Sequence, residues 1–302
     1  MEIAVSGASG LIGTGLVDAL RGSGHVVRRL VRGGSTQPGT VSWDPVEGSI
    51  EEGGLDGVEA FVHLAGEGIG EKRWSTEQKE RIRSSRSLGT SLIARSLAAM
   101  AKPPRVLLSA SAIGWYGNRG DEVLTESSKA PEPPNFLSDV CVDWEAATSP
   151  AADVGIRTVL MRTGIVLTPN GGALGRMITP FRLGLGGRIA SGKQWMSWIS
   201  FEDEIGAMLH LLNDASASGP VNLTAPVPVT NLDFTKALGA ALHRPTILPT
   251  PLAPLKIALG TELVTALLVN GQRVMPAALE ASGYKFKQPD LKSALGSLLA
   301  KK

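Results

Sequence analysis

Short apolar runs alternate with longer segments of helical periodicity through most of the chain. The apolar runs that predict strands are residues 3–6, 26–31, 41–43, 60–64, 106–109, 158–161 and 220–223. Between them, apolar residues recur at three- and four-residue spacing, which predicts helices over residues 12–23, 75–101, 137–147 and 202–213. This repeated strand–helix–strand order predicts an α/β fold, a doubly wound Rossmann-type parallel sheet covered by helices on both faces.

Two regions depart from the alternation. Residues 168–200 are rich in glycine, and prolines interrupt any long element after about residue 227. We therefore expect a Rossmann domain of residues 1–167 plus about 201–226. The remaining residues, about 168–200 plus 227–302, would form a smaller, discontinuous substrate lobe that includes a small C-terminal domain.

Composition narrows the class of partner and the compartment. The 302 residues carry a formal net charge of +2 without a dense basic block, which gives nucleic-acid binding no support. A single cysteine excludes internal disulfides and multi-cysteine metal sites, so we expect no metal and a reducing compartment. The chain enters a strand directly, without a secretory signal, and its longest apolar stretch, residues 251–269, is interrupted by Lys256 and Glu262. We expect a cytoplasmic protein with a small-molecule partner and no membrane partner.

Gly7, Gly10 and Gly13 form a GxxGxxG pattern between the first predicted strand and the first predicted helix. Glycines at such a turn let the backbone approach a pyrophosphate, whose charge is met by the free N–H groups of the helix N-terminus. A plain tight turn would also explain these glycines. Their place at the first strand–helix turn of an alternating chain favours dinucleotide binding.

The end of the second strand discriminates between the two nicotinamide dinucleotides. An acidic residue there would bind the ribose of NAD, but the stretch HVVRRLVRGGS contains Arg28, Arg29 and Arg32 and no Asp or Glu. An arginine can bind a 2′-phosphate through two parallel hydrogen bonds, so we predict NADP(H) as cofactor and Arg32 as the phosphate ligand. Arg28 and Arg29 could instead occupy a solvated strand end.

The fourth predicted strand ends in HLAGEGIG, at the edge of the sheet where such folds bind ligands. Leu64 and Ala65 would place small side chains and backbone beside the cofactor. His63 is better explained as a core residue than as a base, because it precedes the site and no carboxylate is identified that would orient it. Glu67 is a better candidate than His63 for a functional polar group at this strand end.

Further motifs carry a resemblance to a known family. They are GASGLIG, HLAGEGI followed by KRW and SSR, SASAIGWYG, MRTGIVL, FRLGLGGRIASGKQWMSWI and VNGQRVMPAALEASGYKF. Together, over nearly the whole chain, they resemble the atypical extended short-chain dehydrogenase/reductases of the "epimerase family protein" group, which are related to NAD-dependent epimerases and dehydratases and have their own small C-terminal domain. Some relatives carry the label of a cell-division or plastid-division factor.

The resemblance implies a Rossmann sheet of about seven strands that binds NADP(H), with a C-terminal lobe that closes over a substrate cleft. The cofactor contacts that it implies are Ser9, Gly10, Leu11, Ile12, Arg32, Leu64, Ala65, Arg86 and Val166. Without the resemblance, Arg86 could be a plain charge on a helix surface.

The usual acid and base of short-chain dehydrogenases are absent. Those enzymes pair a tyrosine with a lysine four residues later, so that the ammonium lowers the pKa of the phenol. Neither tyrosine of this chain has a lysine at that distance, and alignment on Glu145 puts Leu137 and Cys141 in the two places. Cys141 lacks the basic neighbour that would activate a thiol, so we expect a buried, apolar role for it.

Ser111 and Tyr116 are the catalytic candidates that remain. By the resemblance, Ser111 matches a position whose hydroxyl binds a substrate carbonyl or alcohol, and Tyr116 could bring a phenol to the cleft from the following loop. The structural alternatives are a capping serine and a packed tyrosine. Glu67 is the next candidate acid.

Basic and aromatic residues of the glycine-rich segment could clamp an anionic substrate: Arg182, Arg188, Lys193, Gln194, Trp195 and Trp198. They could equally form a dimer surface or a core, as could Arg73 and Trp74, so a homodimer stays open. We expect an oxidoreductase or epimerase that acts on a small polar or nucleotide-linked substrate. The alternative is an NADP(H)-binding regulatory or cell-division-related protein without turnover.

Overall fold

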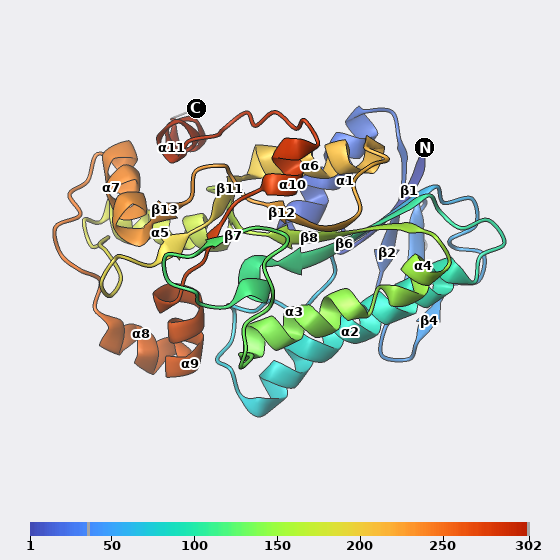
Figure 1. Ribbon diagram of the computed structural model, residues 1–302, viewed down its shortest axis with the longest axis horizontal. Coiled ribbons are helices and arrows are strands. Elements are labelled where there is room, and N and C mark those ends of the chain that lie inside the picture. Colours follow the sequence, from blue (N-terminus) through green and yellow to red (C-terminus); the bar gives the residue numbers. More distant parts are fainter. Residues whose placement is uncertain (35–36, 301–302) are drawn as a thin grey trace.

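The computed structural model describes residues 1–34 and 37–300. At its centre is an eight-stranded sheet in the order β12-β8-β6-β5-β1-β2-β3-β4 (Figure 1). The strands are β1 (Glu2–Ser6), β2 (Val26–Val31), β3 (Thr40–Asp44), β4 (Ser49–Ile50), β5 (Ala60–His63), β6 (Val106–Ala112), β8 (Arg157–Thr163) and β12 (Gly219–Leu223). Neighbouring strands are parallel except β3 and β4, which are antiparallel. The predicted Rossmann-type sheet is confirmed.

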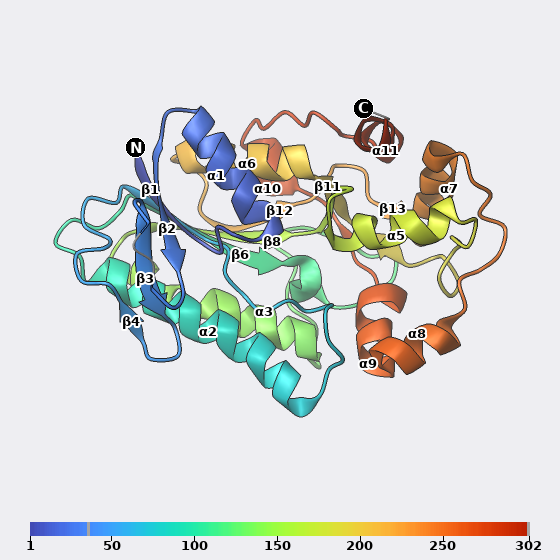
Figure 2. The same cartoon turned by 180° about the vertical axis from the view of Figure 1, so that it is seen from behind.

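Helices cover both faces of this sheet (Figures 1 and 2). One layer contains α1 (Leu11–Gly22), α6 (Phe201–Asn213) and the short α10 (Ala277–Ala281), and the other contains α2 (Thr76–Ala98), α3 (Phe136–Ala146) and α4 (Ser149–Asp153). Side-chain caps fix where two of them begin, because Ser75 accepts from the Gln78 N–H and Ser200 from the Asp203 N–H.

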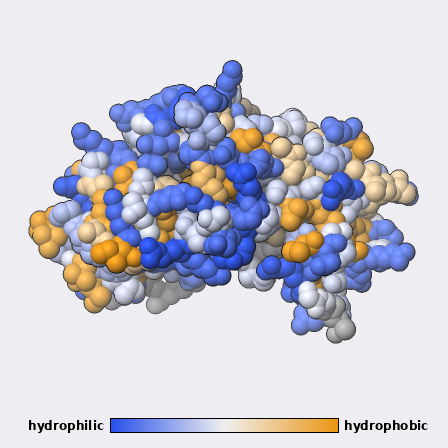
Figure 3. All heavy atoms as spheres, turned by 90° about the horizontal axis from the view of Figure 1, so that it is seen from below, coloured by the Kyte–Doolittle hydropathy of each residue, from blue (hydrophilic) through white to orange (hydrophobic). Residues whose placement is uncertain are grey.

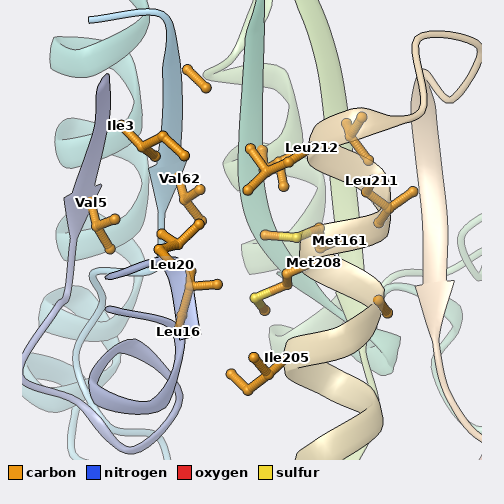
Figure 4. Close-up of a cluster of buried hydrophobic side chains, with 14 of the residues drawn as sticks. Ile3, Val5, Leu16, Leu20, Val62, Met161, Ile205, Met208, Leu211 and Leu212 are labelled. Atoms are coloured by element: carbon orange, nitrogen blue, oxygen red, sulfur yellow. The ribbon is translucent and has the colours of Figure 1, made fainter. Parts of the chain in front are cut away.

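Each interface between the sheet and a helical layer contains an apolar core. Figure 4 shows the core between the strands and helices α1 and α6, where Leu16, Leu20 and Met208 meet the strand residues Val5 and Met161. On the opposite face, the fully or nearly fully buried residues include Trp43, Phe61, Ile93, Leu97 and Leu107. Burial of this apolar surface is the main force that holds the layers together.

A second lobe lies beyond the end of β8. Its elements are β9 (Ile165–Leu167), α5 (Gly172–Arg182), β10 (Trp195–Met196), β11 (Trp198–Ser200), β13 (Val229–Thr230), α7 (Asn231–Leu242), α8 (Leu252–Leu259), α9 (Thr261–Val264), the π-helical turn Thr265–Val269 and α11 (Leu291–Leu299). Two short elements join it to the main sheet region: β7 (Val123–Leu124) pairs with β14 (Arg273–Val274). A separate apolar cluster that includes Phe181, Trp198 and Phe234 forms the core of this lobe.

The C-terminal segment returns from the lobe to the α6 face of the sheet. Leu279 of α10 is buried in the main core. Asp203, fully buried at the start of α6, accepts hydrogen bonds from the Tyr284 hydroxyl at 3.1 Å and from the backbone N–H groups of Lys287 and Gln288 at 2.7 and 2.9 Å. The buried Asp203 carboxylate therefore fixes the path of the C-terminal segment. Among the described residues, no helix has the length and apolar character needed to cross a membrane.

Candidate functional site

The loop between β1 and α1 has a close packing that only glycines allow. Gly7 has a φ of +69°, and a Cβ there would lie 2.7 Å from backbone atoms of Leu64 and Ala65. A Cβ at Gly13 would lie 2.1 Å from the Gly7 carbonyl oxygen. Larger residues at either position would push the loop away from the end of β5, so the turn itself requires both glycines.

Gly10 has different surroundings. A Cβ at Gly10 would meet only the Gly7 carbonyl oxygen, at 3.3 Å. Gly10 is the N-cap of α1, and neither a side-chain cap nor an acidic residue in the first turn neutralises this end of the helix. The free N–H groups and the positive end of the helix dipole are therefore available to an anion such as a phosphate.

A pocket of about 390 Å³ opens beside the same turn. It is lined by Ser9, Gly10, Leu11, Thr14, Gly15, Asp18, Thr168, Asn170 and Phe201. The pocket therefore joins the glycine loop to the segment that follows β9.

Predicted cofactor residues from other elements meet this loop. Leu64 and Ala65 follow β5 and lie against Gly7. On β9, the Val166 carbonyl oxygen lies 3.7 Å from the Cβ position of Gly172, and the Leu11 side chain lies 3.5 Å from that position. The side chain of Ile12 packs against the main core, which leaves its backbone for a ligand. The structure brings these residues to one edge of the sheet, and their contacts with a cofactor stay predictions.

Arg86 extends from α2 to the same edge. Its guanidinium carbon lies 3.4 Å from the Cβ position of Gly66 and 4.8 Å from the centroid of the Trp144 ring. One guanidinium nitrogen donates to the Ile82 carbonyl oxygen, and burial lowers the pKa of the group. Among the described residues, no carboxylate lies within ion-pair distance of Arg86, so its charge is available to a phosphate or a hydroxyl of a ligand.

The three arginines at the second strand have different surroundings. Arg28 is held at the strand by Glu2, whose Oε1 lies 2.5 Å from its Nε, and by the Gly54 carbonyl oxygen at 2.8 Å. Arg29 donates to Gln37 Oε1 at 3.3 Å. Arg32 is exposed in the turn that follows β2. Arg28 therefore has a structural contact, and Arg32 remains the predicted phosphate ligand.

Ser111, near the end of β6, belongs to a buried hydrogen-bond network. Its hydroxyl donates to Glu145 Oε1 at 2.7 Å. Arg162 of β8, which is only 3% exposed, donates to both oxygens of the same carboxylate at 2.8 Å. This bidentate ion pair fixes the carboxylate, which in turn orients the Ser111 hydroxyl and leaves the lone pairs of its oxygen to accept a hydrogen bond.

Tyr116 lies on the other side of the same arginine and is completely buried. Its hydroxyl donates to Asn222 Oδ1 at 2.7 Å and accepts from Arg162 Nη1 at 3.0 Å. Burial raises the pKa of the phenol. The hydroxyl thus already donates and accepts within the protein, which favours the packed-tyrosine alternative, and a part for Tyr116 in proton transfer stays a prediction.

The network continues into the C-terminal segment. Asn222 Nδ2 donates to the Met275 carbonyl oxygen at 2.9 Å. Glu126 Oε1 accepts from the backbone N–H groups of Asn222 and Ala278, at 3.0 and 3.1 Å. The position of Ser111 is therefore coupled through buried polar groups to the segment that follows β14.

Two other polar groups near the site are buried and inert. His63 Nδ1 lies 2.6 Å from Ser6 Oγ, and burial together with Arg86 lowers the pKa of the imidazole to about 3, so the ring is neutral. Cys141 contacts the Ala112 carbonyl oxygen, and burial raises the pKa of its thiol to about 12. Their surroundings agree with the core roles expected from the sequence.

Glu67 is an acidic group with access to solvent on the loop that follows β5. Its side chain is 31% exposed, accepts from Gln78 Nε2 at 3.2 Å and lies 3.8 Å from Lys72 Nζ. The Glu67 backbone N–H donates to Ser85 Oγ, which holds the loop against α2. Its carboxylate is therefore accessible to solvent while the loop stays folded.

The aromatic residues of the glycine-rich segment have separate roles. Trp198 is completely buried in the core of the lobe, where its Nε1 donates to the Val227 carbonyl oxygen at 3.1 Å. Trp195 is half-buried, with the Arg273 guanidinium carbon 4.5 Å from its ring centroid and a hydrogen bond to Asp121. Trp198 is thus a core residue, whereas Trp195 still has surface that a substrate could contact.

Sequence reasoning assigned no role to the buried charged residues Glu145, Arg162 and Glu204. Glu145 and Arg162 hold Ser111, and a charged residue in the apolar strand VLMRTG was the signal that could have identified Arg162. Glu204 of α6 accepts from the Thr163 hydroxyl at 3.0 Å, and its second oxygen has no partner among the described residues. Burial raises the pKa of Glu204 to about 8.

Comparison with known proteins decides the family. Residues 3–223 match the model of the NAD dependent epimerase/dehydratase family, and residues 250–298 match a domain of unknown function, DUF1731. The chain belongs to this epimerase/dehydratase family. Epimerase family protein Mb2239 of Mycobacterium bovis is 44% identical to it over 97% of this chain and 96% of the relative. The family resemblance found in the sequence, including the separate C-terminal domain, is confirmed.

Solved structures of epimerase-family proteins share the whole fold. The crystal structure of human epimerase family protein SDR39U1 (isoform 2) with NADPH has a TM-score of 0.90 at 34% identity, over 99% of both chains. A nucleoside-diphosphate sugar epimerase from Corynebacterium glutamicum has a TM-score of 0.82 at 37% identity, over 99% of this chain and 58% of that one. The family and the NADPH of the human relative confirm the expected class of cofactor.

Proposed function

We propose that this chain binds NADP(H) and catalyses hydride transfer on a small polar or nucleotide-linked substrate held beside Ser111. One observation carries the proposal: the β1–α1 loop, Arg86 and the Ser111 network all lie at the carboxyl edge of a single parallel sheet. The NADPH of human SDR39U1 supports the cofactor, and the name of the Corynebacterium protein supports a nucleotide-sugar substrate.

The residues at this edge fit the parts of the dinucleotide. The open face of Gly10 and the start of α1 would accept the pyrophosphate, and Arg32 the 2′-phosphate. The unpaired Arg86 would meet a phosphate or the ribose hydroxyls. When bound, the cofactor supplies a nicotinamide that accepts or donates hydride. Residues of the second lobe, most of which lie within about 168–200 plus 227–302, would then bind the substrate.

Ser111 would orient the reacting oxygen of the substrate. Its proton is donated to Glu145, so its oxygen can accept a hydrogen bond from a substrate hydroxyl. Ser111 would therefore bind the alcohol form of the substrate. Because both oxygens of Glu145 already accept hydrogen bonds from Arg162, Glu145 acts as a fixed acceptor, and another group has to carry the proton of the reaction.

Glu67 and Tyr116 are the two candidates for that proton. The Glu67 carboxylate is partly exposed on the loop after β5, whereas the Tyr116 hydroxyl already donates to one neighbour and accepts from another. A proton carrier has to exchange its proton with substrate and solvent, so the accessible group is favoured. We assign the proton transfer to Glu67 and a structural role to Tyr116.

The test is a search for turnover with the purified chain. NADP⁺ is offered with UDP-glucose, UDP-glucuronic acid and UDP-N-acetylglucosamine, and nicotinamide absorbance and the NMR spectrum of the sugar are followed. We expect turnover with a nucleotide sugar that is lost in Ser111→Ala, while the NADPH affinity of that variant is unchanged. Wild-type turnover in Ser111→Ala would contradict the assigned site.

A binding protein without turnover is the second candidate. The observation in its favour is that Leu137 and Cys141 occupy the places of the usual tyrosine and lysine, and that the thiol is inert. A chain that binds NADPH tightly yet leaves both the nicotinamide and every sugar unchanged would support this function. Oxidation or epimerisation of any of the sugars would exclude it.

A further inference from the structure

Helix α8 is only partly covered by the rest of the chain. Its sequence, LAPLKIAL, has one charged residue, Lys256, and none of the residues Leu252–Leu259 is buried. It lies within residues 251–269, the longest apolar stretch of the sequence. A helix that is apolar on most of its circumference is normally covered by protein or lipid, so the exposed side of α8 is free for a partner.

Exposed aliphatic side chains of two neighbouring loops extend this surface. We call the set the aliphatic end: Leu183 (69% exposed), Leu185 (68%), Ile247 (87%), Leu248 (71%) and Ile257 (76%). They follow α5, precede α8 and lie on α8 itself. Side chains with such exposed fractions protrude from the surface, whereas those that line a groove are partly enclosed.

Hydrogen bonds to backbone carbonyl groups hold the two loops together. The Arg244 Nε donates to the Arg182 carbonyl oxygen at 2.8 Å, and the Thr250 N–H donates to the Arg188 carbonyl oxygen at 2.9 Å. Figures 1 and 2 both place α8 and the connection from α7 at the end of the molecule opposite to β3 and β4. Hydrophobic side chains also gather at that end in Figure 3, on the left. The aliphatic end is therefore one surface at one pole of the molecule.

The charges around the aliphatic end are positive. Residues 154–201 and 234–261 contain no Asp or Glu. Arg182 and Arg244 are exposed on the two loops, and Lys256 lies on α8. The next acidic residue along the chain, Glu262, is engaged by Lys79 at 2.5 Å. The partner should therefore combine apolar surface with negative charge.

A membrane surface fits this combination better than a second copy of the chain. A two-fold dimer through this end would bring the same arginines face to face without an acidic residue to pair with them. A bound peptide would need a groove, whereas the aliphatic side chains protrude. Protruding aliphatic residues with flanking cations are the features that hold peripheral proteins at the boundary between headgroups and acyl chains.

We propose that the aliphatic end docks this protein onto membranes that contain anionic lipids. The aliphatic side chains enter the headgroup boundary, and Arg182, Arg244 and Lys256 lie next to lipid phosphates. The expectation of no membrane partner rested on the lack of a spanning segment, which peripheral docking does not require. The proposal is independent of the cofactor site.

Flotation of the full chain with lipid vesicles tests it. The vesicles are phosphatidylcholine alone, or phosphatidylcholine mixed with phosphatidylglycerol, at low and high salt. We expect binding to the anionic vesicles, weak binding to the neutral ones, and release by salt. Leu185→Ser combined with Ile247→Ser should weaken binding at least about tenfold, since two aliphatic side chains that would enter the membrane are lost. Arg182→Gln and Arg244→Gln should each weaken it about fivefold.

Two matched variants control for general effects of the substitutions. Val46→Ser removes a side chain that is 81% exposed in the connection between β3 and β4, at the other pole. Lys102→Gln removes an exposed cation after α2. Both should bind vesicles as wild type does, and all variants should keep wild-type NADPH affinity as evidence of folding.

Three outcomes would overturn the proposal. The first is no binding to anionic vesicles at low salt. The second is equal binding by wild type and by the Leu185→Ser, Ile247→Ser double variant. The third is a mass of two chains in light scattering that returns to one chain in the double variant without any vesicle binding, which would assign the surface to a second copy.

Discussion

Ser111 and Glu145 are 34 positions apart in the chain, and a hydrogen bond of 2.7 Å joins them inside the protein. Arg162 binds the other side of the same carboxylate. This arrangement gives the Ser111 hydroxyl a single orientation, although the sequence lacks the tyrosine–lysine pair of short-chain dehydrogenases. The candidate site is therefore positioned by a buried ion pair.

Ser111→Ala distinguishes a role of Ser111 in turnover from a role in the stability of the fold. The substitution removes one hydrogen bond, so we expect a loss of about 1 kcal/mol in the free energy of unfolding. Turnover of the substrate should fall by about two to three decades, because the group that orients the reacting oxygen is gone. Denaturant unfolding and steady-state rates measure the two effects. A decline in NADPH affinity parallel to that in turnover would place Ser111 in the cofactor site instead.

Glu67→Gln and Tyr116→Phe distinguish the two proton carriers. Glu67→Gln should lower turnover by about two to four decades with little change in stability. Tyr116→Phe leaves Asn222 Oδ1 and Arg162 Nη1 each without one partner, so it should cost about 1 to 3 kcal/mol of stability. Rates and melting temperatures of the two variants decide between them. The reverse pattern, with turnover lost only in Tyr116→Phe, would return the proton transfer to Tyr116.

Two glycine substitutions distinguish a glycine that leaves room for the cofactor from one that the packing of the loop requires. Gly10→Val should fold and lose most NADPH affinity, because its side chain enters the face left open for the pyrophosphate. Gly13→Val should destabilise the protein itself, since its Cβ would lie 2.1 Å from the Gly7 carbonyl oxygen. Circular dichroism melting and NADPH titration give the two readouts. Normal NADPH binding by a folded Gly10→Val variant would show that the phosphate site lies elsewhere.

The first part of the fold could be predicted because its signals are local. The first two strands and helix α1 show apolar periodicity, and the glycine turn between β1 and α1 is a motif. The second lobe was harder to predict from the sequence, because its short elements, such as β10 and β13, pair with distant parts of the chain. No periodicity in the sequence indicates that Trp195 pairs with Thr230.

The same distinction applies to the site. The glycine motif and the predicted phosphate ligand Arg32 follow from spacing, whereas the Glu145–Arg162 pair depends on how α3 packs beside β8. The full burial of Tyr116 has the same origin, because its partner Asn222 is 106 positions away. Tertiary contacts of this kind leave no local signal except a charged residue in an apolar strand.

Glu204 predicts a specific dependence of stability on pH. Burial raises its pKa to about 8 from an ordinary value of 4.5, so the folded protein keeps a proton that the unfolded chain releases. The contribution of this residue to stability is complete below about pH 4.5 and is lost as the pH rises to about 8. Wild type should therefore lose stability relative to Glu204→Gln across that range. A constant difference in melting temperature between the two proteins would contradict the raised pKa.

The most direct test of the account is the relative affinity of the chain for NADPH and NADH, measured by calorimetric titration of wild type and of Arg32→Ala. A bidentate contact with the 2′-phosphate contributes roughly 1.5 to 3 kcal/mol, so wild type should bind NADPH about one to two decades more tightly than NADH. Arg32→Ala should remove most of that preference, and Arg28→Gln should keep it, because Arg28 is paired with Glu2. Equal affinities of wild type for the two dinucleotides, or an unchanged ratio in Arg32→Ala, would contradict the proposed NADP(H) site.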